Sequence, residues 1–368
     1  MSLYFTLPAL FVQHWVIFAS VVVLMLLGIV DDLARIHSAL RIFVQICVGV
    51  AIHFEGNLAF KSVGDIWFIG DLGLGPYSLT FTCIAVVGGV NAINMMDGLD
   101  GLCGLIVGTA VAFLAGMALV AGDRDVFFIS SILLAVLATF LLFNYRFPWN
   151  RRAVIPSDPS AHLNDPSVIQ NDPAVILNDP AVIQNDPAVI LNDPPVILNE
   201  PSVILNEPSV ILSYRGRARL KDLDTKPRAR IFLGDNGAYV LGFLVVALFL
   251  MATQSVYKGG SQVLTPVTAL WLLFIPLIDI ARVIWIRSRA GRWPVSDDRL
   301  HLHYILRDRG FSTGKVVNLM FVTAMATAGI GVFFYYSGIS ESWSYLAFMT
   351  LCVLYFVVTN RMVRKNHE

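Results

Sequence analysis

The stretch LTFTCIAVVGGVNAINMMDGLDG, residues 79–101, decides the fold class. Its apolar part, residues 79–96, carries no charged side chain and is long enough for an α-helix to cross a bilayer. It runs directly into Asp97-Gly-Leu-Asp100-Gly. Carboxylates at a membrane boundary are costly to desolvate, so they indicate a functional site. The stretch therefore predicts a transmembrane helix that carries a polar motif to one face of a membrane.

The composition of the whole chain is that of a membrane protein. Of its 368 residues, 56% are hydrophobic and 14% are charged, whereas a soluble domain is nearer half apolar and a quarter charged. The net charge of zero gives no indication of a nucleic-acid partner. The cysteines lie in apolar runs and form no CxxC pair, so we interpret them as small buried hydrophobic residues rather than a disulfide or zinc set. They are Cys47, Cys83, Cys103 and Cys352.

About nine apolar segments along the chain are long enough to span a bilayer. They cover residues 10–30, 40–54, 79–96, 102–121, 126–143, 238–251, 263–286, 316–336 and 343–359. The second and the sixth are the shortest. Together the segments predict an all-α fold, a polytopic inner-membrane helical bundle of about nine transmembrane helices.

The distribution of basic residues gives the orientation of this bundle. If the first span reaches the cytoplasm at Asp31, the opposite side holds only Lys61, Arg124 and Lys258 of the 26 Lys and Arg residues. Because cytoplasmic loops carry the excess of basic residues, this orientation is favoured. The alternation of spans then places the other polar clusters on the same face. These clusters contain Asp97, Asp100, Asp235 and His301.

A tandem repeat of seven residues, such as NDPAVIL, fills residues 164–212. A proline in every copy forbids a continuous helix, and Asn-Asp-Pro is typical of turns. Two alternatives remain, a disordered loop and a short stacked β-coil, of which we expect disorder. The repeat divides the chain into an N-terminal transmembrane part (1–148), a cytoplasmic insertion (149–227) and a C-terminal transmembrane part (228–368).

The polar clusters have the residue types that a metal-assisted reaction of phosphates needs. Carboxylates bind Mg²⁺, which usually bridges the protein to substrate phosphates, and phosphoryl transfer depends mainly on positioning and charge neutralisation. Asp97 and Asp100 share a helix face with Asn91 and Asn94, whose amides offer donors and acceptors to a base or sugar. Asp235 opens an apolar run, at a helix N-terminus that suits a metal–phosphate pair.

Other polar residues support the same chemistry or have simpler interpretations. His301 and His303, with Arg299 nearby, supply donors for a pyrophosphate, although two histidines in a basic loop are more often solvated. Asp279 has Arg282 three residues later, which predicts a local ion pair.

The clusters, in this order, resemble the polyprenyl-phosphate hexosamine-1-phosphate transferases of glycosyltransferase family 4. NAINMMDGLDGL (91–102) is the most specific part of the resemblance. The other parts are GIVDD (28–32), Arg41 with Gln45, FLLFN (140–144), IFLGDNGAY (231–239), PVTALW (266–271) with PLID (276–279), and DRLHLH (298–303).

The resemblance implies a Mg²⁺-dependent enzyme, with Mn²⁺ as an alternative ion. It would transfer an N-acetylhexosamine-1-phosphate from a UDP-sugar to undecaprenyl phosphate in the bilayer and release UMP, starting an envelope polysaccharide such as O-antigen. The expected catalytic residues are Asp31, Asp32, Asp97 and Asp100, the first two acting at the lipid phosphate. The expected substrate-binding residues are Asn91, Asn94, Asn144, Arg299, His301 and His303. The expected metal ligands are Asp97 and Asp235.

Alternative functions remain at this point. A phospho-N-acetylmuramoyl-pentapeptide transferase is a close rival, although those enzymes tend to carry three adjacent histidines where this chain has His301-Leu-His303. The resemblance also leads us to expect a chain that is N-terminally short relative to the family, whose members usually begin with two further spans. An inactive truncated membrane remnant is therefore the non-enzyme alternative.

Overall fold

The computed structural model describes residues 12–34, 36–56, 58–145, 197–199, 202–204, 211–213, 231–258, 262–292 and 300–364. The chain divides into two compact units. One comprises residues 1–146 and 229–368, and the other comprises residues 147–228.

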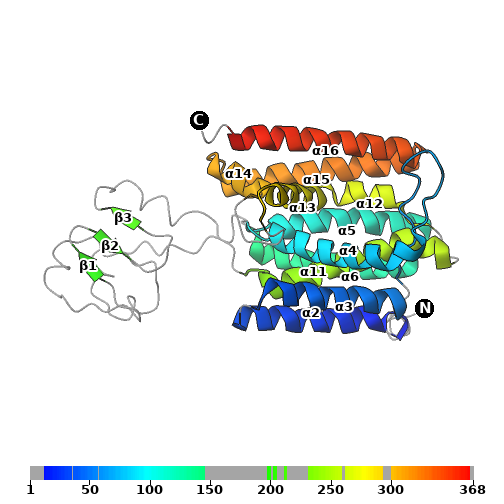
Figure 1. Ribbon diagram of the computed structural model, residues 1–368, viewed down its shortest axis with the longest axis horizontal. Helices are drawn as coiled ribbons and strands as arrows, with labels where there is room; N and C mark the ends of the chain where they lie inside the picture. Colours follow the sequence, from blue (N-terminus) through cyan, green and yellow to red (C-terminus); the bar gives the residue numbers. More distant parts are fainter. Residues whose placement is uncertain are drawn as a thin grey trace. The chain divides into compact units, whose positions relative to one another are not determined.

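The first unit is a bundle in which most helices run along one common direction, whereas α13 (Phe274–Arg289) runs across it (Figure 1). Its long helices are α2 (Trp15–Ala34), α3 (Ser38–Phe54), α4 (Ser78–Met96), α5 (Leu102–Ala121), α6 (Arg124–Asn144), α11 (Gly234–Gln254), α13 (Phe274–Arg289), α15 (Thr313–Tyr336) and α16 (Glu341–Arg364). Its short helices are η1 (Gly75–Tyr77), η3 (Ser255–Lys258), α12 (Pro266–Leu272) and α14 (Leu302–Asp308).

Polar residues mark where several of these helices begin. The Asp123 carboxylate accepts a hydrogen bond from the backbone N–H of Val126 and so caps α6. The Ser312 hydroxyl does the same for α15 through the N–H of Lys315. These side chains satisfy backbone donors that have no partner inside the helix.

Seven of the described helices are long and apolar enough to cross a membrane, and the number is eight if the bent pair α12 and α13 forms one span. Large apolar side chains on the outer faces of these helices are exposed, for example Val22, Ile84, Val322 and Val353. Such surfaces suit lipid rather than water. The chain is thus an α-helical multi-pass membrane protein, and the count of nine spans stays a prediction.

The segment expected to span the membrane over residues 263–286 is a bent pair of helices rather than one continuous helix. The chain bends by 85° between α12 and α13, at Leu273, whose backbone leaves the helical conformation. Pro276 lies in the first turn of α13, where its ring would clash with the carbonyl of residue 272 in a continuous helix. The bend turns the start of α13 away from the axis of α12.

α11 is almost wholly buried and lies between α2 and α4. A Cβ atom on Gly28 of α2 would lie 2.2 Å from Cα of Asn236, and one on Gly242 would lie 2.7 Å from Cα of Val90 in α4. Only glycine permits backbones to approach this closely. The two crossings bring the C-terminal ends of α2 and α4 against the N-terminal end of α11.

The cysteines are all free. Cys103 and Cys352 are buried, as expected, but Cys47 is exposed on α3 and Cys83 is half-buried. The prediction of burial is wrong for Cys47. An apolar side chain on the outer face of a lipid-facing helix contacts lipid, so it does not need to be buried within the protein.

The second unit contains three short antiparallel strands, β1 (Ile197–Asn199), β2 (Ser202–Ile204) and β3 (Ile211–Ser213). Ile197 pairs with Ile204, and Val203 pairs with Leu212. The strands lie in the last copies of the repeat or just after it. The rest of residues 147–228 lies outside the described residues, so the expectation for the insertion stays a prediction.

Candidate functional site

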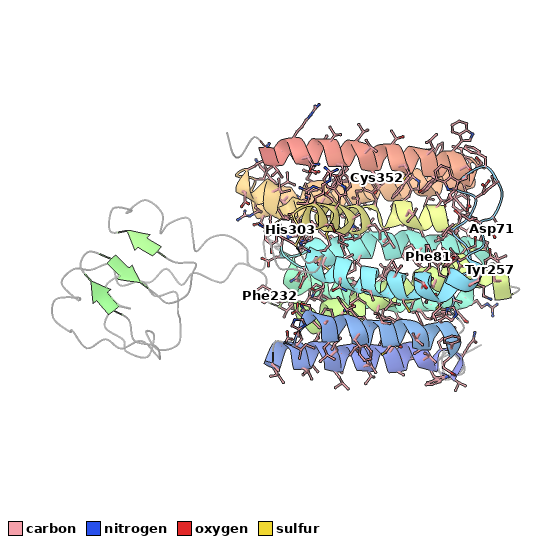
Figure 2. The ribbon with its side chains drawn as sticks, viewed as in Figure 1. Asp71, Phe81, Phe232, Tyr257, His303 and Cys352 are labelled. Carbon is pink, nitrogen blue, oxygen red and sulfur yellow. The ribbon has the colours of Figure 1, made fainter. Side chains whose placement is uncertain are left out.

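The polar motifs gather at one end of the first unit. Figure 2 shows His303 and Phe232 at this end, and Asp71 and Tyr257 at the opposite end. The C-terminal ends of α2 and α4 and the N-terminal end of α11 meet there (Figure 1). The site therefore combines residues that are far apart in the sequence, such as Asp31 and Tyr239, whose side chains are hydrogen-bonded although 208 positions separate them.

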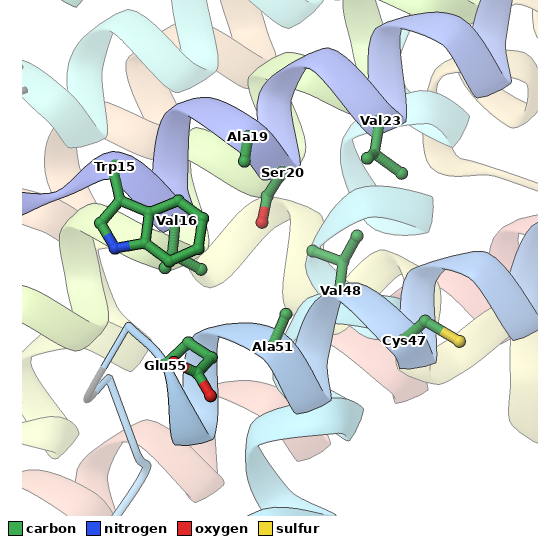
Figure 3. Close-up of a pocket in the computed structure, with 9 residues that line it drawn as sticks. All are labelled: Trp15, Val16, Ala19, Ser20, Val23, Cys47, Val48, Ala51 and Glu55. Atoms are coloured by element: carbon green, nitrogen blue, oxygen red, sulfur yellow. The ribbon is translucent and has the colours of Figure 1, made fainter.

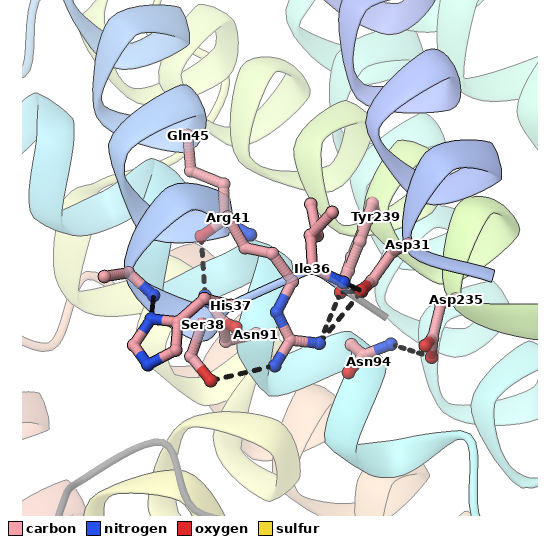
Figure 4. A network of polar contacts seen from close by, with 11 residues as sticks. Asp31, Ile36, His37, Ser38, Arg41, Gln45, Asn91, Asn94, Asp235 and Tyr239 are labelled. Carbon is pink, nitrogen blue, oxygen red and sulfur yellow. Dashed lines mark hydrogen bonds and ion pairs between the residues drawn. The ribbon is translucent and has the colours of Figure 1, made fainter. Parts of the chain in front are cut away.

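Asp31 is buried, and both of its carboxylate oxygens accept hydrogen bonds (Figure 4). Oδ1 accepts from the backbone N–H of Ile36 at 3.1 Å. Oδ2 accepts from Nη1 of Arg41 at 2.9 Å and from the Tyr239 hydroxyl at 2.9 Å. A buried carboxylate is stable only when it is paired and hydrogen-bonded in this way. Asp31 is thus held in place as the partner of Arg41.

Arg41 and Tyr239 were not among the expected site residues. Arg41 also donates to the Ser38 hydroxyl at 3.2 Å and to the Tyr239 oxygen at 3.1 Å, so it ties α3 to α2 and α11. The sequence held a signal for Tyr239, because it follows Asp235 by four residues and so shares its helix face.

Asp32 differs from its neighbour. Its side chain is exposed, and it faces the negative charges of Asp235 and Asp31. Of the expected Asp31-Asp32 pair, Asp32 is therefore the carboxylate that is open to a ligand.

Asp97 and Asp235 come together where α4 ends and α11 begins. Asn94 donates an amide hydrogen to Oδ1 of Asp235 at 2.8 Å (Figure 4). Burial raises the pKa of Asp97 to about 7, and the charges of Asp235 and Asp100 act in the same direction, whereas a hydrogen bond from the backbone N–H of Gly234 acts against them. The structure thus concentrates negative charge around Asp97, and no basic side chain among the described residues is found to balance it.

The negative charge around Asp97 bears on whether the site suits a divalent cation. No group of three or more His, Cys, Asp or Glu side chains with metal-binding spacing occurs in the part of the chain that the structure describes. Mg²⁺, however, usually takes only one or two protein carboxylates and fills its remaining positions with water and substrate oxygens. Two carboxylates that repel one another, Asp97 and Asp235, fit that requirement.

Asn91 and Asn144, both expected to bind substrate, use their amides on the protein itself. The Asn91 amide donates to Oε1 of Gln45 and to the carbonyl of Val87, both at 2.7 Å. Asn144 accepts from the N–H of Gly101 at 2.7 Å and donates to the carbonyl of Ile231 at 2.8 Å. Asn91 links α3 to α4, and Asn144 holds the DGLDG loop next to the chain that enters α11. Both residues therefore stabilise the segments that carry the site, through hydrogen bonds within the protein.

The two histidines are buried rather than solvated. Nδ1 of His301 lies within hydrogen-bond distance of the Asp279 carboxylate, 2.7 Å from Oδ2. The predicted pairing of Asp279 with Arg282 is wrong, because Asp279 turns instead toward the segment that begins α14. Arg299 lies outside the described residues.

His303 has no exposed surface, and within the described part of the chain neither of its ring nitrogens has a hydrogen-bond partner. Burial lowers the pKa of His303 to about 4 against the opposing charge of Asp279, so the ring is neutral. A Cβ atom on Gly98 would lie 2.3 Å from Nε2 of His303. The α14 segment therefore packs directly against the DGLDG loop.

A separate groove of about 210 Å³ lies between α2 and α3 (Figure 3). Its lining is almost entirely apolar and includes Trp15, Ala19, Val48 and Ala51, with Glu55 at one end. Trp15 begins α2 and Glu55 follows α3, so the groove lies toward the end of the bundle opposite Asp31. It suits a hydrocarbon chain and is not part of the carboxylate site.

Comparison with known proteins adds to this geometry. The family model of glycosyl transferase family 4 matches residues 14–151. This segment of the chain is therefore similar to glycosyl transferase family 4. The expected resemblance is thereby confirmed, and the segment contains Asp31, Asp32, Asp97, Asp100 and Asn144.

Relatives of this family 4 segment carry one common description, undecaprenyl-phosphate alpha-N-acetylglucosaminyl 1-phosphate transferase. The relative from Escherichia coli O157:H7 is 35% identical over 129 residues, which cover 35% of this chain and 34% of that protein. The relative from Haemophilus influenzae is 37% identical over 131 residues, which cover 35% of this chain and 35% of that protein. The chain thus spans about a third of the length of the curated relatives it matches.

Asp235, His301 and His303 lie beyond the family 4 match. The structure nevertheless brings Asp235 to Asn94 and His303 to Gly98, both inside the matched segment. The two halves of the chain therefore form one site.

Proposed function

We propose that this protein transfers N-acetylhexosamine-1-phosphate from a UDP-sugar to undecaprenyl phosphate and releases UMP, as the first step of an envelope polysaccharide. The observation that carries the proposal is the cluster of Asp32, Asp97 and Asp235 at one end of a lipid-facing bundle. The descriptions of the family 4 relatives support the lipid phosphate and the N-acetylglucosaminyl 1-phosphate group.

In this reaction an oxygen of the lipid phosphate forms a bond to the β-phosphorus of the UDP-sugar. The bond between that phosphorus and the oxygen bridging to the α-phosphate breaks, and UMP leaves with that oxygen. The attacking group comes from the lipid, so the reaction needs no nucleophilic side chain. The protein's task is to hold two anionic substrates together and to balance their charge.

Asp97 and Asp235 would hold the Mg²⁺ ion. Such an ion, when bound, neutralises charge on the phosphates. Asn94 fixes Oδ1 of Asp235, and no other described side chain hydrogen-bonds to this carboxylate. The hydrogen bond from Gly234 holds the Asp97 carboxylate at the N-terminus of α11, where backbone N–H groups also favour an anionic substrate.

Asp32 and Arg41 would serve the acceptor. Both lie where α2 and α3 meet the membrane boundary, so a lipid phosphate can reach them without leaving the bilayer. The Arg41 guanidinium, held by Asp31, offers a fixed positive charge to that phosphate. The exposed Asp32 carboxylate can take the proton of a monoprotonated lipid phosphate.

We assign the site to the cytoplasmic face of the bacterial inner membrane. The basis is the positive-inside rule, because the loops at the other end hold only Lys61, Arg124 and Lys258. A nucleotide sugar is available on that face only.

The test is a reconstituted assay. Purified protein in detergent micelles, given UDP-N-acetylglucosamine, undecaprenyl phosphate and Mg²⁺, should release UMP and form a lipid-linked sugar. UDP-N-acetylmuramoyl-pentapeptide, tried as donor in a parallel reaction, tests the rival transferase. Absence of UMP with both donors would remove the enzymatic proposal and favour an inactive protein.

A further inference from the structure

Side chains of α13 form hydrogen bonds to three consecutive residues, 300–302, at the start of α14. Oδ2 of Asp279 pairs with Nδ1 of His301 at 2.7 Å, and Oδ1 accepts the backbone N–H of Leu302 at 3.0 Å. Arg282, one turn further along α13, donates from Nη1 to the carbonyl of Leu300 at 2.7 Å. This clamp leaves the backbone around His301 little freedom.

A third element, α16, completes the environment of Asp279. The Tyr355 hydroxyl donates to Oδ1 of Asp279 at 2.8 Å. Asp279 is 1% exposed and His301 is 3% exposed. A buried carboxylate with donors on both oxygens cannot rotate without leaving a donor unpaired, which would be costly. The position of the carboxylate therefore fixes the His301 ring.

The hydrogen bond to Asp279 also determines the tautomer of the His301 ring. Nδ1 of His301 carries a hydrogen whenever it donates to the Asp279 carboxylate, so only Nε2 is left for another partner. Among the described residues, no hydrogen bond engages Nε2 of His301. The ring stacks on His303, with 5.8 Å between centroids and 12° between planes, and His303 contacts Gly98 beside Asp97.

We propose that Asp279 is a positioning residue, which together with Tyr355 and Arg282 sets the tautomer and orientation of His301 so that Nε2 meets the phosphates of the donor. This inference rests on the proposed function, because the donor is the nucleotide sugar named there. A phosphate oxygen can accept a hydrogen bond from Nε2 once that nitrogen also carries a proton, and the Asp279 carboxylate then balances the positive charge of the ring. Asp279 itself does not touch the substrate.

The variants that test this proposal are Asp279→Asn, His301→Gln and the double variant. Asparagine keeps the shape of the side chain, but its NH₂ group can donate to Nδ1 and so favours the opposite tautomer. We expect Asp279→Asn to raise the KM for UDP-N-acetylglucosamine about tenfold or more, with a smaller change in the KM for the lipid phosphate. In the His301→Gln background the same change should alter kcat/KM less than about twofold, because interacting residues give non-additive effects.

Two further variants serve as controls. Tyr355→Phe removes one donor to Asp279 and keeps the charge, so the donor KM should rise in the same direction but less. Asp71→Asn changes a carboxylate at the opposite end of the bundle, where Ser62 and Tyr257 donate to it, and should leave the donor KM unchanged.

Additive losses in the double variant, or an unchanged donor KM in Asp279→Asn, would overturn the positioning role while the wild-type activity stands. A wild-type protein that neither releases UMP nor binds UDP-N-acetylglucosamine would instead overturn the proposed function, and this inference with it. Nitrogen-15 NMR of histidine-labelled protein reads the tautomer without any turnover. The His301 signal, identified by its loss in His301→Gln, should show Nδ1–H in the wild type, and an Nε2–H tautomer there would contradict the proposal.

Discussion

Replacement of Gly28 by alanine should damage the site without changing any polar residue. The added Cβ would lie 2.2 Å from Cα and 2.3 Å from Cβ of Asn236, whereas carbon atoms in contact lie about 3.5–4 Å apart. Because backbone atoms cannot rotate away, α2 and α11 must separate by about 1–2 Å, and overpacking of this kind costs about 1–3 kcal/mol.

The separation acts directly on the reacting groups. Asp31 and Asp32 lie on α2 one turn from Gly28, and Asp235 and Tyr239 lie on the facing turn of α11. A displacement of 1 Å in a positioned site can reduce the rate about a hundredfold. We therefore expect Gly28→Ala to lower kcat for UMP release by about a hundredfold and to lower the midpoint of thermal unfolding in detergent.

Gly116→Ala is the matched control, because Gly116 also lies within a helix but an added Cβ meets no atom within 4 Å. Alanine is the better helix former by about 1 kcal/mol, so this variant should be fully active and at least as stable as the wild type. Equal activity of Gly28→Ala and Gly116→Ala would refute the close crossing of α2 and α11 as the basis of the site.

Three further predictions concern the charged groups. Asp97→Asn should reduce UMP release by at least about a hundredfold, and Mg²⁺ should raise the unfolding temperature of the wild type but not of this variant, since a bound ligand stabilises the folded state by mass action. Asp31→Asn should lower the unfolding temperature, because it leaves Arg41 without its anionic partner at a cost of about 3 kcal/mol; Asp32→Asn should leave that temperature unchanged and reduce kcat. For His303, the pKa is about 4 in the folded protein and 6.5 ordinarily, so the unfolded state binds the proton first as the pH falls. Stability should therefore decline by up to about 3 kcal/mol between pH 6.5 and pH 4, and thermal unfolding of His303→Gln over this range should show a smaller decline.

The sequence predicted the parts of this molecule that depend on local pattern. Charge-free runs marked the helices, because a bilayer admits no other spanning structure for such residues. The excess of Lys and Arg on alternate loops placed Asp97 and Asp235 at one end of the bundle, and their side chains do lie together there. The DGLDG motif was informative because two carboxylates so close to an apolar run have few structural explanations.

The parts that could not be predicted depend on which helices touch. Helical periodicity says which residues share a face, but α11 is apolar on all sides and so gives no hint that it packs on α2 through Gly28. The bend at Leu273 could not be predicted from the sequence, because proline is tolerated inside many membrane helices and Pro276 alone does not indicate a bend. The partner of Asp279 was missed for the same reason, since the spacing to Arg282 offered a local pair while His301 reached it from another segment.

The acidic residues of the site fall into two classes that the sequence does not distinguish. Asp31 and Asp279 each accept three hydrogen bonds. Asp31 is paired with the guanidinium group of Arg41, and Asp279 is paired with the imidazole ring of His301. Asp97, in contrast, is surrounded by further carboxylates and carries a raised pKa. A carboxylate of the first kind stabilises the fold and orients its partner, whereas one of the second kind is unfavourable until a cation or a proton arrives. Substitution at the first kind should therefore reduce stability first and activity through the partner, and substitution at the second should reduce activity while stability is kept or increased.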